Sequence, residues 1–312
     1  MPGTVHVLSG DAAATRWREA GGTGATVVWR EALVAGPIGA PPASPRWLDE
    51  RAAFLAAYAG VAPEACRRDL ERQQLELTAA LDADEVVLWF ARDLFCELAL
   101  AYVLHVIGAH ARRPRRLSLV HPAESGTRAF PCFGALEPAA VHGLLAGRRD
   151  VADDDLSAAR AAWEALAAPS PERLDALAAG PGPFASALRK QRARFPVLGD
   201  GLGVTERAAL RALGDAPVPI AAVLAPVGAA LPEYGWTDVQ VESELAALAS
   251  GATPLVVRTI DGFAITAGGR AVLAGAADRV ALCPPDSWIG GVRVASRPWR
   301  RNPRGGRLVA PR

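Results

Sequence analysis

The sequence predicts an α/β protein that begins with a Rossmann-like, mostly parallel sheet. Short apolar runs at 4–8, 25–29, 85–90 and 115–121 have the length of buried strands, and segments with helical spacing separate them. Strands that alternate with helices favour parallel βαβ units with right-handed crossovers. The chain has 312 residues, of which 51% are hydrophobic and 21% charged, and this composition is typical of a globular protein with a sizeable core.

The first strand, 4–8, ends at Ser9-Gly10-Asp11 and leads directly into a helix over 12–20. A strand that enters a helix through a glycine turn places backbone N–H groups and an acidic side chain at the carboxyl end of the sheet. Ligands of open α/β folds bind at this end. Ser9, Gly10 and Asp11 are therefore candidate ligand-binding residues.

Further polar and aromatic residues lie at the ends of the other three strands. They are Trp29, Arg30, Glu31, Trp89, Asp93 and His121. Glu31, Asp93 and His121 are the candidate catalytic residues, because carboxylates and imidazoles transfer protons. Asp11 and Asp93 are the candidate ligands of a hard cation such as Mg²⁺, which prefers carboxylate oxygens.

Arg30 and the N-termini of two helices suit an anionic or phosphorylated group, and Trp29 and Trp89 are predicted to wall the pocket. Each position also has a structural alternative. Asp11 and Asp93 lie where a helix N-cap is expected, and the two tryptophans have the alternative of core packing. For Glu31 the alternative is a surface carboxylate or a partner of Arg30, and for His121 it is an imidazole whose hydrogen bonds are satisfied at the strand end.

A loop rich in proline and glycine is predicted over 35–45, followed by helices over 46–59 and 63–81. A strongly apolar helix over 94–107 follows the third strand. From residue 137 the pattern becomes helical, and a hairpin with an Asp261-Gly262 turn comes after three further helices. This order is that of a winged helix.

Four parts are predicted along the chain. They are an α/β domain at 1–136, a helical connector at 137–198, a winged-helix-like domain at 199–286 and an arginine-rich tail at 287–312. The tail contains seven arginines and no acidic residue, and we expect it to be solvated and partly disordered.

Nucleic acid is not an expected partner. The formal net charge is +1, and the third helix of the winged-helix order, 237–249, carries Asp238, Glu242 and Glu244 with no Lys or Arg. Phosphates would be repelled from that face, so a protein-contact or structural role is favoured. The phosphate-loop motif GxxxxGK[ST] is also absent. The glycine cluster at 21–24 does not fit a dinucleotide-binding motif, because it follows a helix rather than a strand.

The cysteines and the hydropathy pattern predict a cytoplasmic protein without a membrane span. Cys66, Cys96, Cys132 and Cys283 are scattered and lack metal-binding spacing, as expected of reduced thiols. No apolar run reaches the roughly 18 residues that a membrane helix needs, and no secretory leader pattern begins the chain.

The motifs HxLxGD at 6–11, WREAL at 29–33 and WFxxDLFC at 89–96, together with TrpIleGlyGly at 288–291, form a specific set. With this set the chain resembles the bacterial domain-of-unknown-function family eighteen thirty-five along nearly its whole length. Glu97 departs from the family pattern, where a glutamine is expected. The family has no assigned activity, so the resemblance implies no reaction. It agrees with the analysis of the residues in pointing to Gly10-Asp11, Arg30-Glu31 and Asp93 as the candidate site.

We predict a metal-assisted hydrolase or phosphoryl-transfer enzyme that acts on a small polar or phosphorylated molecule. Asp11 and Asp93 would anchor the pocket or the metal, Glu31 would be the general base and Arg30 would bind the anion. On this interpretation, Glu31→Gln abolishes activity and barely changes the melting temperature. The alternatives are a regulatory or nucleic-acid-associated protein that acts through its carboxyl-terminal part, and a scaffold without catalysis.

Overall fold

The computed structural model describes residues 3–122, 133–295 and 298–311. The chain divides into two compact units. The first consists of Met1–Leu33, Ala40–Ala57 and Val61–Glu164, and the second consists of Val34–Gly39, Tyr58–Gly60 and Ala165–Arg312. The borders predicted from the sequence after residues 136, 198 and 286 therefore fall inside these units.

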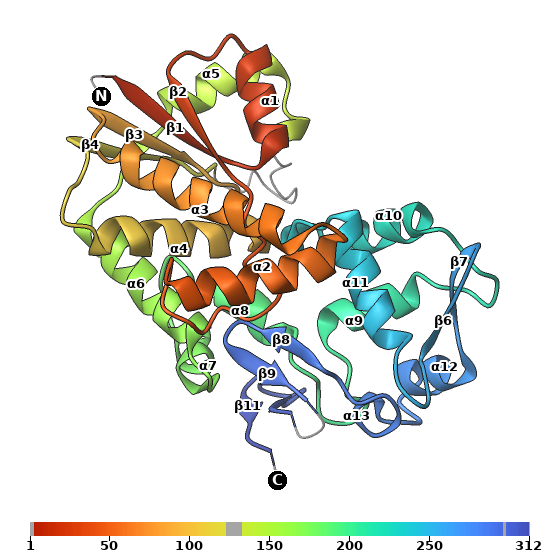
Figure 1. Ribbon diagram of the computed structural model, residues 1–312. Helices are drawn as coiled ribbons and strands as arrows, with labels where there is room; N and C mark the ends of the chain where they lie inside the picture. Colours follow the sequence, from red (N-terminus) through yellow and green to blue (C-terminus); the bar gives the residue numbers. More distant parts are fainter. Residues whose placement is uncertain (1–2, 123–132, 296–297, 312) are drawn as a thin grey trace. The chain divides into compact units, whose positions relative to one another are not determined.

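The first unit contains a five-stranded sheet and the helices that connect its strands (Figure 1). Its elements are β1 (Thr4–Ser9), α1 (Asp11–Glu19), β2 (Ala25–Trp29), α2 (Pro45–Ala59), α3 (Pro63–Ala80), β3 (Glu85–Trp89), α4 (Leu94–Ala109), β4 (Arg116–Val120), η1 (Phe133–Ala135), α5 (Pro138–Ala146), β5 (Arg149–Asp150) and α6 (Asp153–Ala167). The last turn of α2 and that of α6 extend into the second unit.

The strand order of the sheet is β2-β1-β3-β4-β5. The first four strands are parallel, with Leu8 of β1 beside Trp89 of β3, and β5 pairs antiparallel with β4. The predicted parallel α/β sheet is thus confirmed. The edge strand β5 lies in the segment that we predicted to be entirely helical, because two residues are too short to show a strand pattern.

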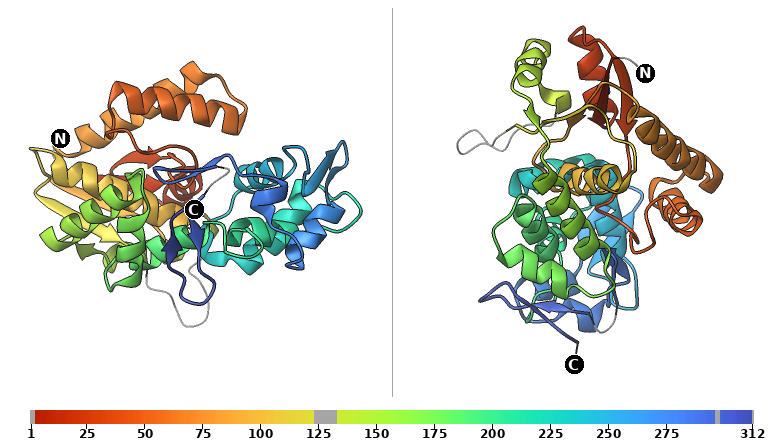
Figure 2. Two further views of the ribbon diagram at one scale, coloured as in Figure 1. Left: turned by 90° about the horizontal axis from the view of Figure 1, so that it is seen from below. Right: turned by 90° about the vertical axis from the view of Figure 1, so that its left-hand side faces the viewer.

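Helices cover both faces of this sheet (Figures 1 and 2). α1 and α5 contact each other on one face, and α3 and α4 lie on the other. Burial on both faces explains why β1 and β3 are almost continuously apolar. It also explains the apolar character of α4, in which 11 of 16 residues are buried. Among the described residues, no helix combines the length and the hydropathy that a membrane span requires.

The second unit is mainly helical, with short antiparallel strand pairs. Its elements are α7 (Glu172–Ala179), α8 (Ala185–Ala193), α9 (Val204–Arg211), α10 (Ile220–Ala230), η2 (Pro232–Tyr234), α11 (Asp238–Leu248), β6 (Val256–Thr259), β7 (Gly262–Ile265), α12 (Ala267–Leu273), α13 (Arg279–Leu282), β8 (Ser287–Ile289), β9 (Val292–Val294), β10 (Arg300–Arg301) and β11 (Leu308–Val309). α9, α10 and α11 pack against one another, and β6 and β7 form the hairpin expected around Asp261-Gly262.

The structure corrects the expectation of a solvated, partly disordered arginine tail. β8 pairs with β9 and β10 pairs with β11. Ile289, Val292 and Val294 form a buried cluster with Phe195, and Trp299 packs against it. The sequence did not predict this cluster, because strands of two or three residues are too short to give a recognisable alternation of apolar and charged residues.

Candidate functional site

The carboxyl ends of β1 and β3 lie next to each other at the point where the strand order reverses. β1 is followed by a crossover to β2 on one side and has β3 as its neighbour on the other. Such switch points bind ligands in open α/β folds. Gly10, which follows β1, has φ +91°, so the turn from β1 into α1 requires a glycine.

Ser9, Asp93 and Cys96 meet at this edge. The Ser9 side chain is within hydrogen-bonding reach of the Cys96 thiol, whose pKa is raised by burial first and by the nearby Asp93 carboxylate. Asp93 Oδ1 accepts a hydrogen bond of 2.8 Å from the Cys96 backbone N–H and caps α4. The capping alternative for Asp93 is therefore what the structure shows, and Cys96 is a neighbour that sequence reasoning missed.

Asp11 does not cap α1, because Gly10 is the N-cap and Asp11 is the first residue of the helix. Both its carboxylate oxygens instead accept hydrogen bonds from Arg30, from Nε at 2.8 Å and from Nη2 at 2.7 Å. These bonds lower the pKa of Asp11. Residues that follow β1 and β2 are thus joined by one bidentate ion pair.

Arg30 and Glu31 line a cavity of about 260 Å³ at the carboxyl end of β2. The other lining residues come from α2, from α3 and from the turn between these helices, and they are Leu55, Val61, Ala65, Cys66, Asp69, Leu70 and Gln73. The backbone N–H of Arg30 donates to Gln73 Oε1 at 2.6 Å, and Gln73 Nε2 donates to Asp69 Oδ2 at 2.8 Å. We refer to this cavity as the β2–α3 pocket.

Glu31 is buried and is bound by the equally buried Arg51 of α2. Arg51 Nε donates to Glu31 Oε1 at 2.8 Å, and Nη2 contacts the same oxygen and also the carbonyl of Ala32 at 3.1 Å. Glu31 Oε2 is buried and accepts no hydrogen bond within the described parts of the chain. Burial raises the pKa of Glu31, although Arg51 acts in the opposite direction. Glu31 is therefore not the surface carboxylate of the structural alternative.

Trp29 and Trp89 are buried in the core, as the structural alternative has it, and Trp89 also lines a small cavity of about 10 Å³ beside β1 and α1. Trp29 is 1% exposed and packs on Tyr102 with ring centroids 5.3 Å apart. Trp89 is 2% exposed, packs on Trp17 and donates from Nε1 to His6 Nδ1 at 3.1 Å. Sequence reasoning did not separate the two roles, because large apolar rings suit both.

His121 follows β4 at the same sheet edge. Its Nδ1 lies 2.7 Å from the Phe90 carbonyl oxygen, so Nδ1 carries the proton and donates it. This bond orients the ring. A catalytic role for His121 stays a prediction.

The described residues do not fit the expected magnesium site. Within 3–122, 133–295 and 298–311, no three His, Cys, Asp or Glu side chains are grouped so that they could hold a metal ion. Asp11 accepts two bonds from Arg30, and Asp93 holds the N-terminus of α4. The carboxylates of Asp11, Glu31 and Asp93 thus each have a separate partner, and we derive no step through a metal.

The residues that sequence reasoning missed at the β2–α3 pocket are Asp69, Gln73, Cys66 and Arg51. Asp69 and Gln73 are four positions apart, so they lie on one face of α3 and could have been read as a polar pair. Arg51 gave no such signal, since the chain holds many arginines and only burial distinguishes this one. Cys132, the fourth cysteine, lies outside the described residues, and the other three are free thiols.

The fold and the site together define an α/β protein with a pocket of mixed apolar and charged lining beside the carboxyl edge of its sheet. A scan against protein-family models and a search of curated proteins found no match to this chain. The resemblance to the bacterial family eighteen thirty-five therefore stays a prediction.

Proposed function

We propose that the first unit binds a small polar or phosphorylated molecule in the β2–α3 pocket, and that Glu31 transfers a proton there. Hydrolysis and phosphoryl transfer are the reactions that a carboxylate base and an arginine support together. The observation that carries the proposal is Glu31 Oε2, a buried and unsatisfied oxygen on a residue that lines a cavity. Such groups are costly, and a native structure that retains one calls for a functional reason.

Arg30 supplies the positive charge for an anionic ligand. Its Nε and Nη2 donate to Asp11, and its Nη1 donates to no side chain or backbone group within the described residues. Asp11 therefore fixes the orientation of the guanidinium while Nη1 can still donate to a ligand oxygen. Asp11 is a positioning residue in this proposal.

Glu31 has the surroundings of a proton carrier. Burial brings its pKa up from the ordinary value, and Arg51 stabilises the ionised form. Oε2 is closed to solvent in this structure, so the proposal requires that ligand binding exposes it to the β2–α3 pocket. In hydrolysis, Oε2 then accepts a proton from water, the water oxygen bonds to the electrophilic atom of the ligand, and the leaving group departs with the electrons of the broken bond. In phosphoryl transfer, a ligand hydroxyl takes the place of the water.

Ligand binding can be tested by thermal shift of the full chain with nucleoside monophosphates, sugar phosphates and inorganic phosphate. At least one phosphorylated probe should raise the melting temperature, and Arg30→Gln should abolish that rise. Arg46→Gln is the matched control, because Arg46 is an exposed arginine paired with Glu50 within α2. An equal rise with Arg30→Gln, or no rise with any probe, would contradict the proposal.

A second candidate function involves the second unit. α9, α10, α11 and the β6–β7 hairpin follow one another as in a winged helix, and Val218 forms a bridge with Phe263 beside the hairpin. We propose that this part is a winged-helix-like module for protein contact. α11 lacks basic residues, and Arg258 of the hairpin is paired with Glu242, so its charge does not favour nucleic acid.

The ion pairs of the carboxyl-terminal segment also argue against nucleic acid as a ligand, because they neutralise its arginines. Arg293 pairs with Asp286, Arg300 pairs with Asp278, and Arg307 pairs with Asp175. An electrophoretic shift at low salt tests the nucleic-acid alternative, and we expect no retardation of duplex DNA or single-stranded RNA. Truncation before residue 287 is unsuitable as a probe, because it removes part of the apolar cluster around Phe195.

A cytoplasmic location also remains a proposal. Cys66, Cys96 and Cys283 are free thiols, and free thiols suit a reducing compartment.

A further inference from the structure

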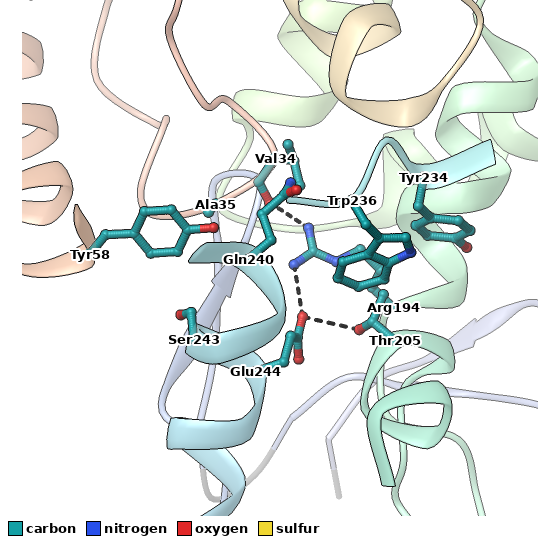
Figure 3. Close-up of a pocket in the computed structure, with 10 residues that line it drawn as sticks. All are labelled: Val34, Ala35, Tyr58, Arg194, Thr205, Tyr234, Trp236, Gln240, Ser243 and Glu244. Atoms are coloured by element: carbon teal, nitrogen blue, oxygen red, sulfur yellow. Dashed lines mark hydrogen bonds and ion pairs between the residues drawn. The ribbon is translucent and has the colours of Figure 1, made fainter. Parts of the chain in front are cut away.

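The second unit contains a pocket whose lining is different in character from that of the β2–α3 pocket (Figure 3). Its ten lining residues are Val34, Ala35, Tyr58, Arg194, Thr205, Tyr234, Trp236, Gln240, Ser243 and Glu244. All of them belong to the second compact unit. We call it the α11 pocket, because three of its polar side chains come from that helix.

Aromatic rings form two sides of the α11 pocket. In Figure 3, Tyr58 lies on one side and Trp236 on the other. Tyr234 stacks behind Trp236 with ring centroids 6.1 Å apart and an interplanar angle of 17°. The Tyr234 hydroxyl donates to the Lys190 carbonyl at 3.1 Å, which fixes this ring in place. The Tyr234–Trp236 side of the pocket is therefore held in place, and the aromatic rings suit an apolar group.

One cation and one anion lie between these walls. Arg194 donates to the Val34 carbonyl and lies 3.5 Å from Glu244 Oε1, and Thr205 Oγ1 donates to the same carboxylate oxygen at 3.1 Å. The side chains of Arg194 and Glu244 are only 11% and 18% exposed, so both charges are held in fixed positions away from bulk water. The pocket thus contains an ion pair without net charge.

Three polar groups of α11 in this pocket have hydrogen-bonding capacity that the described residues do not use. Gln240, Ser243 and Glu244 share one face of the helix through their spacing of three and four residues. The Gln240 amide oxygen accepts from the Thr237 N–H, but its Nε2 donates no bond. Within the described residues, the hydroxyl of Ser243 has no hydrogen-bond partner, and the bonds to Glu244 reach Oε1 and not Oε2. Two donors and one carboxylate oxygen in the lining are therefore available to a ligand.

We propose that the α11 pocket binds a zwitterionic α-amino acid with an apolar side chain. The ligand ammonium group would donate to Glu244 Oε2, and its carboxylate would accept from Gln240, Ser243 and Arg194. A zwitterion adds one charge of each sign beside the Arg194–Glu244 ion pair, so the occupied pocket stays neutral, whereas a ligand with a single charge adds a net charge to a largely buried site.

The size of the pocket agrees with this class of ligand. Its volume is about 50 Å³, more than the ~10–15 Å³ that one water requires. The pocket is partly open, so a head group of this size can lie against the Arg194–Glu244 pair while the side chain extends along Trp236 or Tyr58. A nucleotide or a peptide is too large for the enclosed part.

Calorimetric titration of the full chain with L-leucine and L-phenylalanine tests the proposal. Two analogues of phenylalanine measure the contribution of each charged group of the ligand, since phenethylamine lacks the carboxylate and 3-phenylpropionate lacks the amine. We expect at least one amino acid to bind and each analogue of phenylalanine to bind at least about tenfold more weakly, the loss expected when one charged contact is removed. An absence of binding by both amino acids, or equal binding of an analogue, would overturn the assignment.

Variants on α11 locate the site. Glu244→Gln should weaken amino-acid binding at least about tenfold, and Glu242→Gln on the same helix should leave it unchanged, because Glu242 pairs with Arg258 outside the pocket. Ser243→Ala serves as the second variant: its hydroxyl holds no other group, so the fold is preserved while affinity falls severalfold. Binding unaffected by both Glu244→Gln and Ser243→Ala would place the ligand elsewhere and refute the proposal.

Discussion

Glu31 and Arg51 form an ion pair in the interior of the first unit, with exposures of 1% and 0% for their side chains. Glu31 follows β2 and Arg51 lies within α2, so the pair connects the end of an edge strand to the next helix across a loop. A buried pair of this kind stabilises little relative to apolar residues, but removal of one partner leaves the other charge without compensation.

The first prediction follows from that relationship. Glu31→Gln should destabilise the first unit by about 3–5 kcal/mol, because it leaves the Arg51 guanidinium buried beside a neutral amide. Urea denaturation followed by circular dichroism measures this loss. The sequence alone led us to expect barely any change in melting temperature, and the buried partner reverses that expectation.

Two comparisons show whether the loss comes from the buried charge. The double variant Glu31→Leu with Arg51→Met should recover most of the stability, since neither charge remains. Asp11→Asn breaks an exposed pair and should cost at most about 1 kcal/mol. Equal losses in Glu31→Gln and Asp11→Asn would mean that burial does not govern the effect.

The second prediction separates the capping role of Asp93 from a catalytic one. Asp93→Ala should cost about 1 kcal/mol of stability, because the Cys96 N–H loses its acceptor, and Asp93→Asn should retain most of it since asparagine also caps helices. If the carboxylate takes part in chemistry, both variants lose turnover of any substrate found by the ligand screen. Full turnover by Asp93→Asn would limit Asp93 to the cap.

The third prediction concerns acid stability and His6. Burial lowers the pKa of His6 from 6.5 to about 4. Its Nδ1 accepts from Trp89 Nε1, so the folded protein holds the neutral ring. The stability from this site is present above pH 6.5 and is lost as the pH falls from 6.5 toward 4, because the unfolded chain binds the proton more readily.

We expect His6 to contribute of the order of 2 kcal/mol to that loss, somewhat less than the full shift implies because a cavity beside His6 admits water. His6→Gln keeps an acceptor for Trp89 but does not titrate. Unfolding free energies measured from pH 7 to pH 4 should therefore fall less steeply in His6→Gln than in the wild type. Parallel curves for the two proteins would show that other groups cause the acid sensitivity.

The fourth prediction tests the turn between β1 and α1. Gly10→Ala should destabilise the fold by about 1–2 kcal/mol, because the backbone at φ +91° disfavours a Cβ atom even though no neighbour lies within 4 Å of it. Gly143→Ala is the control, since Gly143 lies within α5, has open space around it and should gain up to about 1 kcal/mol. Melting temperatures of the two variants that shift in the same direction would contradict this account.

The local patterns of the first unit were sufficient to predict its architecture. β1, β2, β3 and β4 are apolar runs of strand length separated by helical segments, and parallel pairing follows because each crossover contains a helix. The same logic placed Ser9, Arg30 and Asp93 at one sheet edge. Strand polarity alone decides this, since residues that follow parallel strands leave the sheet on the same side.

The sequence by itself therefore determined the four parallel strands of the sheet, their polarity and the positions of the residues along their carboxyl edge, but not the antiparallel edge strand β5. Tertiary structure alone decided which partner each side chain has: Arg30 for Asp11, Arg51 for Glu31, and the N-terminus of α4 for Asp93. It also decided that the residues after Asp286 pack in part against Phe195. The physical reason is that periodicity records which side of an element is buried, whereas the pairing of charges depends on contacts between segments far apart in the chain.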